Sequence, residues 1–230
     1  MNYTRIETCD RTWNVITGCD QKCFDGHCYA YQIIKRFEKT WGYDWTPTFH
    51  PERLDQPRKV KKPSLIFAIS MGDWHCPSIY NLWIDRMLKA MRECPQHRFQ
   101  LQTKFAKGIE VFDFPPNVWL GVSLCYKKDV ERLDYLRKTN ARIKYAYCEP
   151  LLELIEPDFE GIDWVVIGGL TGRKAFKAPI EWILDVIKRA DKVGAKIFVK
   201  ENLIPNNHLK EFPDEEWMIN ERRASRMDKR

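Results

Sequence analysis

Short runs of apolar and β-branched residues alternate along this chain with stretches that carry apolar residues at helical spacing, and this alternation restricts the possible folds most strongly. The predicted strands are Thr12–Thr17, Leu65–Ser70, Phe99–Thr103, Val118–Ser123, Ile143–Cys148, Trp164–Gly168 and Lys196–Val199. Between them, helical stripes are predicted around residues 30–37, 80–91 and 180–187. Strand–helix alternation implies parallel strands joined by right-handed crossovers. The sequence therefore predicts an α/β protein.

Two α/β architectures fit this pattern: a doubly wound open sheet, or a barrel built of βα units. The chain has 230 residues, which is short for a complete eight-unit barrel of about 250 residues. We expect a partial (βα)6 TIM-like barrel with a parallel sheet and an additional C-terminal strand. This barrel is predicted to form a single domain over residues 1–204, followed by a C-terminal extension over residues 205–230.

Charge and hydropathy exclude some classes of protein. The formal net charge is +6, and the last ten residues hold five basic and two acidic side chains, so this basic tail alone carries +3. The surplus of basic over acidic residues in the rest of the chain is too small to demonstrate an anionic partner. No run approaches the roughly 18 apolar residues of a membrane helix, and the N-terminus lacks an apolar leader. We therefore expect a cytoplasmic protein that does not enter a membrane.

Three of the eight cysteines cluster in the loop over residues 18–29, after the first predicted strand. Cys19, Cys23 and Cys28 have the spacing C-x3-C-x4-C, and thiolates of this kind bind zinc or iron. A closed zinc site would need a fourth ligand, for which His27 and Cys9 are the candidates. The odd number of thiols and their position at a strand end favour an iron–sulfur cluster with one open iron.

A long segment, residues 40–63, interrupts the alternation of strands and helices. It contains four prolines and is rich in aromatic residues, which argues against disorder. It is interpreted either as a lid or substrate wall, or as a plug over the open side of an incomplete barrel.

At this point the sequence resembles the radical S-adenosylmethionine superfamily, whose hallmark is three cysteines on the loop after the first strand of a partial barrel. The chain also resembles a family of small phage-associated proteins of unassigned function. The matching segments are TWNVITGC, HCYA, HPERL, SMGD, FQLQTK, PPNVWLGVS, CEPLL, DWVVIGG and IFVK. There are two departures. The second gap in the cysteine motif is longer than usual, with His27 in the aromatic position, and Leu170 replaces a glutamate that relatives tend to carry.

The resemblance implies a [4Fe–4S] cluster on Cys19, Cys23 and Cys28, and S-adenosylmethionine as the second cofactor. The residues that it implies for binding S-adenosylmethionine are His27, Ser70, Gly72, Asp73, Lys104, Ser123, Gly168 and Gly169. Each also has a structural interpretation, such as a turn, a cap or a solvated charge. Glu149 and Lys200, at the ends of buried strands, are candidate catalytic residues that could equally form a buried ion pair.

The implied activity is reductive cleavage of S-adenosylmethionine, which yields a 5′-deoxyadenosyl radical that abstracts hydrogen from a substrate. An external electron donor resembling flavodoxin or ferredoxin would reduce the cluster. The aromatic segment and the basic tail point to a nucleotide or nucleic acid as the substrate. The alternative is a non-catalytic module, stabilised by zinc or an iron–sulfur cluster, that binds nucleic acid.

Overall fold

The computed structural model describes residues 1–172, 175–214 and 217, apart from the side chain of Asp25. The chain divides into two compact units. The first comprises residues 1–105 and 112–119, and the second comprises residues 106–111 and 120–230.

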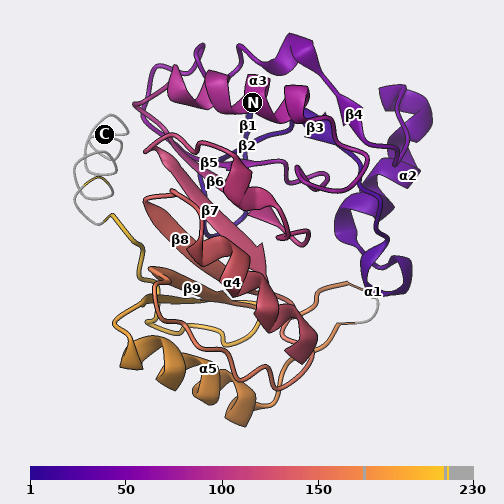
Figure 1. Ribbon diagram of the computed structural model, residues 1–230. Coiled ribbons are helices and arrows are strands. Elements are labelled where there is room, and N and C mark those ends of the chain that lie inside the picture. The colour runs from indigo at the N-terminus through magenta and orange to yellow at the C-terminus, as the bar shows by residue number, and fades with distance from the viewer. Residues whose placement is uncertain (173–174, 215–216, 218–230) are drawn as a thin grey trace, which may run out of the picture. The chain divides into compact units, whose positions relative to one another are not determined.

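A mostly parallel sheet provides the framework (Figure 1). Its strands are β1 (Asn2–Tyr3), β2 (Arg11–Trp13), β5 (Leu65–Ala68), β6 (Arg98–Thr103), β7 (Val118–Ser123), β8 (Ile143–Cys148), β9 (Trp164–Ile167) and β10 (Lys196–Val199). Within the described residues this sheet has eight strands in the order β1-β2-β5-β6-β7-β8-β9-β10. The described strands thus follow chain order, without the reversal of order that defines a doubly wound sheet. The predicted α/β class is confirmed.

Among the described strand pairs of this sheet, pairing is parallel in both units, with one exception. In the first unit β2 pairs with β5 and β5 with β6, and in the second β8 pairs with β9 and β9 with β10, all parallel. The exception is β1, which pairs antiparallel with β2. The sequence did not predict β1, because its two residues are exposed and too short to show a period.

The first predicted strand, Thr12–Thr17, is wrong as a single element. It splits into β2 and β3 (Ile16–Thr17), and β3 forms a separate antiparallel pair with β4 (Thr48–Phe49). Asn14 lies at the break, where its Oδ1 accepts hydrogen bonds from the Met71 amide (3.0 Å) and the Ser70 hydroxyl (3.2 Å). These bonds tie the break to the chain just beyond β5.

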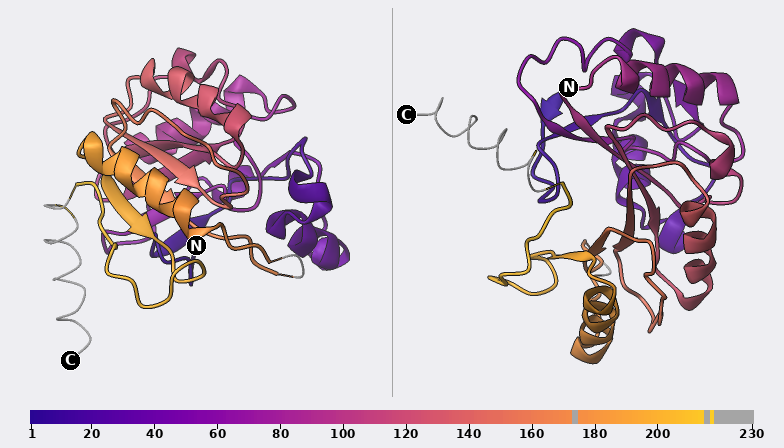
Figure 2. Two further views of the ribbon diagram at one scale, coloured as in Figure 1. Left: turned by 90° about the horizontal axis from the view of Figure 1, so that it is seen from below. Right: turned by 60° about the vertical axis from the view of Figure 1, so that its left-hand side comes forward.

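The helices are α1 (Cys23–Gly26), α2 (Tyr29–Trp41), α3 (Asn81–Arg92), α4 (Arg132–Arg137) and α5 (Ile180–Lys192), with 3-10 turns η1 (Pro51–Arg53), η2 (Ile109–Val111) and η3 (Lys127–Glu131). The helices α2 to α5 each bury some of their side chains, whereas the described side chains of α1 are half-buried. In the second unit α5 packs along β9 and β10 (Figure 2). The stripe predicted for this helix is partly wrong: Ile180 and Leu184 are exposed, while Val186 and Ala190 are buried. None of the helices in the described part of the chain is long and apolar enough to cross a membrane.

The extension predicted over residues 205–230 is described only in part. Residues 205–214 pack on the second unit, where the Trp164 indole donates to the Glu211 carbonyl (2.9 Å) and the Phe212 ring contacts Trp164 and Phe198. The basic tail lies outside the described residues.

His97 is a buried histidine that makes the stability of the protein depend on pH. The imidazole is fully buried, and its Nδ1 accepts a hydrogen bond from the Ser64 amide (3.1 Å) while Nε2 donates to the Pro57 carbonyl (3.1 Å). Burial lowers the pKa of His97 below its ordinary value of 6.5, so the folded chain keeps this ring neutral where the unfolded chain binds a proton. The contribution of the neutral His97 ring to the free energy of unfolding is fully present above about pH 6.5. It decreases as the pH falls below this value, because the unfolded state then binds a proton that the folded state does not.

We therefore expect the free energy of unfolding to fall between pH 7 and pH 5, and to fall less steeply in His97→Gln. Urea denaturation at a series of pH values measures both slopes. His50, which is buried and also has a lowered pKa, adds to the slope in the same direction. Parallel curves for the two proteins would show that His97 does not couple folding to protons.

Candidate functional site

Three backbone segments meet at the entrance of the cysteine loop. The Gly18 amide donates to the Met71 carbonyl (2.9 Å), and the Cys19 amide donates to the Trp45 carbonyl (3.1 Å). A Cβ atom on Gly18 would lie 2.4 Å from the Trp45 carbonyl oxygen, and one on Gly72 would lie 2.3 Å from the Gly18 carbonyl oxygen. Close backbone packing therefore accounts for Gly72, which was predicted to lie at the cofactor.

The three loop cysteines differ in their surroundings. Cys19 is buried, whereas Cys23, which begins α1, and Cys28, just before α2, are half-buried. Figure 1 shows the short α1 followed directly by α2. Burial raises the pKa of the Cys23 thiol, and the positive charge of Lys104 opposes this rise. Within the described residues, no three His, Cys, Asp or Glu side chains are arranged to hold a metal ion.

Asp73 connects the ends of β5 and β6. Its carboxylate accepts hydrogen bonds from the Thr103 hydroxyl (2.6 Å), the Lys104 amide (2.8 Å) and the His75 amide (3.0 Å). The carboxylate is buried. A hydrogen bond with Cys76 and burial raise the pKa of Cys19, burial raises the pKa of Cys23, and the charge of Asp73 adds to both rises. The structure thus brings Asp73 to the cysteine loop, where its amide donates to the Gly18 carbonyl (3.2 Å), and gives its carboxylate partners within the protein.

The other residues of the first unit that were predicted to bind S-adenosylmethionine also contact groups of the protein in that unit. The Lys104 ammonium lies over the Phe24 ring in the cysteine loop, 5.5 Å from its centroid. Ser70 bonds to Asn14, and its carbonyl accepts a hydrogen bond from the Tyr29 hydroxyl. His27 places Nδ1 2.9 Å from the Phe24 carbonyl of its own loop.

We expect Asp73→Asn to lower the free energy of unfolding by about 2 kcal/mol, because an amide nitrogen would face donors that now have an acceptor. Chemical denaturation of the variant and of Thr103→Val measures this loss. The Thr103 variant removes the hydroxyl that donates to Asp73 and also accepts the Phe105 amide hydrogen (2.9 Å), so its loss should also be about 2 kcal/mol. If the Asp73 variant is as stable as the wild type, the hydrogen bonds that connect the ends of β5 and β6 contribute nothing to the free energy of unfolding.

A cavity of about 500 Å³ opens beside the first cysteine. Cys19 and Lys22 line it from the cysteine loop, Tyr31 and Lys35 from α2, and Trp45 from the long aromatic segment. The Trp45 indole donates to the Gln21 carbonyl (3.2 Å). The first part of residues 40–63 therefore lines this cavity.

A second group of predicted residues lies in the second unit, at the ends of β8 and β10. Lys200 Nζ lies 2.8 Å from each carboxylate oxygen of Glu149, and these side chains are 14% and 17% exposed. The Asn202 amide donates to Glu149 Oε1 (3.3 Å) and to the Gly169 carbonyl (3.1 Å). A Cβ atom on Gly168 would lie 2.7 Å from the Glu149 carboxyl carbon, so this glycine makes room for the ion pair.

Ser123, at the end of β7, is buried beside a second ion pair. Its carbonyl accepts a hydrogen bond from Arg132 (2.6 Å), which also pairs with Asp129 (2.7 Å). Asp129 in turn accepts the amide hydrogens of Cys125 (2.9 Å) and Tyr126 (3.0 Å). This network fixes the loop that follows β7.

A family model described as a protein of unknown function, DUF5131, matches residues 3–227. The chain belongs to the DUF5131 family. No curated protein and no solved structure matches the sequence.

In this DUF5131 chain, four residues that contact the predicted site residues or their neighbours were not themselves predicted from the sequence: Asn14, Cys76, Asp129 and Asn202. Asn14 and Asn202 each form a hydrogen bond with a backbone group of a neighbouring loop. No local sequence pattern predicts a contact of this kind. Asp129 stands three residues after Tyr126 at the start of η3, a position typical of a helix cap, and this could have been found. Cys76 is buried beside Cys19, a contact between two separate loops.

Proposed function

We propose that this protein is a radical S-adenosylmethionine enzyme with a partial (βα)6 barrel and that it acts in the cytoplasm. The observation that carries the proposal is the set of three thiols on one loop, which adjoins the polar ends of the parallel strands β5 and β6. All eight cysteines are free, which suits a reducing compartment.

The donor set suits an iron–sulfur cluster, because soft thiolates are its usual ligands. Cys19, Cys23 and Cys28 would hold three of the four irons. When bound and reduced by an external donor, the cluster supplies the electron that cleaves S-adenosylmethionine to methionine and a 5′-deoxyadenosyl radical.

The residues of this chain would bind and orient the reactants. In the first unit, the Asp73 carboxylate is the candidate partner for the methionine ammonium, and Lys104 for the methionine carboxylate, since each offers the opposite charge. Ser70, Gly72 and His27 are the other candidate contacts there. In the second unit, Ser123, Gly168 and Gly169 are the candidates for nucleoside contacts, and Glu149 with Lys200 for contacts to the substrate.

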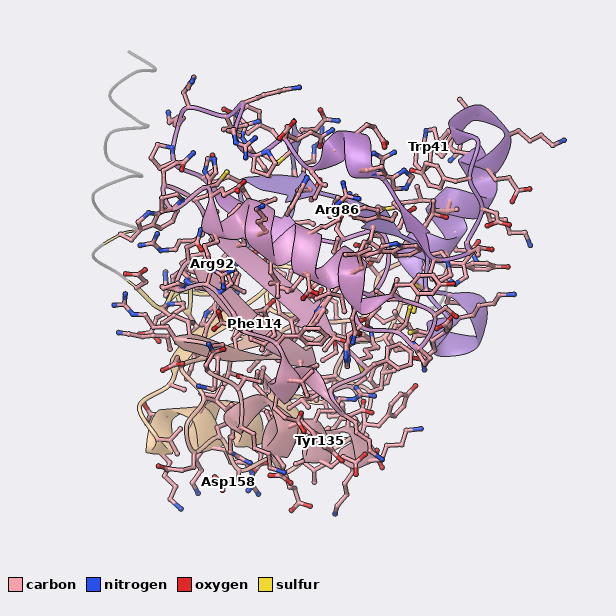
Figure 3. The ribbon with its side chains drawn as sticks, turned by 45° about the horizontal axis from the view of Figure 1, so that its top comes forward. Trp41, Arg86, Arg92, Phe114, Tyr135 and Asp158 are labelled. Carbon is pink, nitrogen blue, oxygen red and sulfur yellow. The ribbon has the colours of Figure 1, made fainter. Side chains whose placement is uncertain are left out.

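We propose a nucleotide or nucleic acid as the substrate, on the strength of an aromatic ladder in the first unit. Phe37, Trp41 and Tyr43 stack in succession, with centroid distances of 5.1 and 5.8 Å. Figure 3 marks Trp41 at the end of α2. Arg36 lies over Phe37 and Arg53 over Tyr43, a combination of rings and cations that suits bases and phosphates.

The proposal is tested by anaerobic reconstitution with iron and sulfide, followed by reduction and addition of S-adenosylmethionine. The expected result is a brown protein that releases 5′-deoxyadenosine. A colourless zinc protein without cleavage would overturn the enzyme and leave the metal-stabilised nucleic-acid-binding module. Incubation with nucleotides, DNA and peptides, followed by mass analysis, tests the substrate. A mass change on peptides alone would contradict the nucleic-acid proposal.

A further inference from the structure

A second aromatic ladder lies beside α3 in the first unit. Phe49 of β4 stacks on Trp83 of α3, with 5.5 Å between the ring centroids and 12° between the ring planes. Tyr80, just before α3, packs edge-to-face against Trp83 at 5.1 Å. Arg86 lies over the Phe49 ring, 5.0 Å from its centroid. This second ladder repeats the composition of the first, in which Arg36 lies over the first of three successive rings.

The two ladders adjoin at the end of β4. The Tyr43 ring of the first ladder meets the His50 ring edge-on at 5.0 Å, and Phe49, the residue before His50, begins the second ladder. Consecutive Cα atoms are about 3.8 Å apart, so this segment joins the two ladders directly. In Figure 1, β4 lies between α2 and α3. Figure 3 marks Trp41 of the first ladder at the end of α2 and Arg86 of the second on α3.

Both ladders offer exposed ring surface next to positive charge. Tyr80 is 67% exposed and Trp41 is 40% exposed. Arg36 and Arg86 are exposed too, and neither has an ion-pair partner among the residues that the structure describes. Exposed rings bordered by unpaired guanidinium groups are complementary to a ligand that carries both flat rings and negative charges.

We propose that the two ladders together bind a single strand of nucleic acid, so that the substrate is a polymer and not a single nucleotide. The inference narrows the substrate of the proposed function and rests on that function for the reaction. Trp41 and Tyr80 offer ring surface for bases, and Arg36 and Arg86 offer charge for phosphates of the same strand. A single strand fits this surface better than a duplex, whose bases already stack on one another.

The test is the affinity of the full-length protein, without added S-adenosylmethionine, for a fluorescent strand of about 12 thymidine nucleotides, within the usual site size of single-strand binding folds. Fluorescence anisotropy compares this strand with its duplex, with thymidine monophosphate and with inorganic polyphosphate. We expect the strand to bind at least about tenfold more tightly than each of the others, because two or more stacked bases contribute. Equal affinity for the nucleotide or the duplex would overturn the proposal. Equal affinity for polyphosphate would also overturn it, because polyphosphate carries charge without bases.

One variant in each ladder tests whether both ladders bind the strand. Trp41→Ala and Tyr80→Ala are each expected to weaken binding at least about fivefold, the lower end of the effect of removing a ring that stacks a base. Tyr80→Phe keeps the ring and should bind like the wild type. Arg86→Gln should lower the slope of log affinity against log salt by about 0.7, the share of one phosphate contact. If either alanine variant binds like the wild type, the ladders do not act together and the proposal fails.

Tyr3→Ala is the matched control. Tyr3 is 72% exposed in the same unit and Arg11 lies over its ring at 3.8 Å, but this pair belongs to β1 and β2, outside both ladders. The variant should bind the strand like the wild type. If Tyr3→Ala weakens binding as much as Trp41→Ala does, the strand binds any exposed ring beside an arginine, and the two ladders are not the site.

This binding measurement separates the inference from the proposed function, because it requires neither a cluster nor S-adenosylmethionine. If the strand binds through both ladders and S-adenosylmethionine is never cleaved, the proposed function fails and the single-strand site stands. If S-adenosylmethionine is cleaved and the strand does not bind, the inference alone fails.

Discussion

Replacing Cys23 by Ala is expected to abolish both the brown iron–sulfur absorption and the release of 5′-deoxyadenosine. Three thiolates are the minimum that the proposed cluster requires, so loss of one removes the cofactor as well as lowering the rate. Cys23 is half-buried at the start of the short α1, and we expect its removal to cost less than about 1 kcal/mol of stability. Iron analysis, absorption spectra and thermal unfolding on the same preparation separate these effects.

The matched control for this experiment is Cys9→Ala. Cys9 was the alternative fourth ligand in a zinc site, and it is buried in the first unit, outside the cysteine loop. The variant should keep the iron content and the cleavage of S-adenosylmethionine. Full activity in Cys23→Ala, or equal iron loss in both variants, would refute the ligand assignment.

Much of the fold was predictable because buried parallel strands are encoded by short runs of apolar residues that can be recognised in the sequence. The bounds of β7, β8 and β10 match the predicted runs, since each is an apolar segment that ends at polar or turn-forming residues. The run predicted to end at Ser70 stops at Ala68, because Ile69 adopts a left-handed φ of 61°. Backbone conformations of this kind depend on tertiary contacts that the residue types do not reveal.

The candidate site was predictable in part, and for a related reason. Ser70, Asp73 and Lys104 follow buried strands, so topology alone brings them to the same end of the sheet in the first unit. The partner of Ser70 was not predictable, because Asn14 reaches it from a separate segment of the chain. Sequence periodicity encodes the faces of helices and strands, whereas contacts between loops arise only after the chain has folded.

The Glu149–Lys200 pair illustrates a choice that the sequence left open, between a catalytic pair and a structural ion pair. The structure confirms the ion pair, and Asn202 adds a third partner. We expect Glu149→Gln and Lys200→Met each to destabilise the protein by about 3 kcal/mol, because each leaves one largely buried charge without its counter-charge. Chemical denaturation at pH 7 measures both losses.

The double variant Glu149→Gln/Lys200→Met then separates stability from function. With both charges removed, no buried charge remains unpaired, and we expect its loss of stability to be at least 2 kcal/mol smaller than the sum of the single losses, within the usual range of about 0.5–3 kcal/mol for contacting pairs. Strict additivity would show that the two groups do not interact in solution. A double variant that is nearly as stable as the wild type, binds its cluster and no longer modifies substrate would assign the pair to the reaction. One that is equally stable and fully active would make the pair a structural feature of the second unit, because a charged pair that can be replaced without loss of activity does not contact the reacting groups.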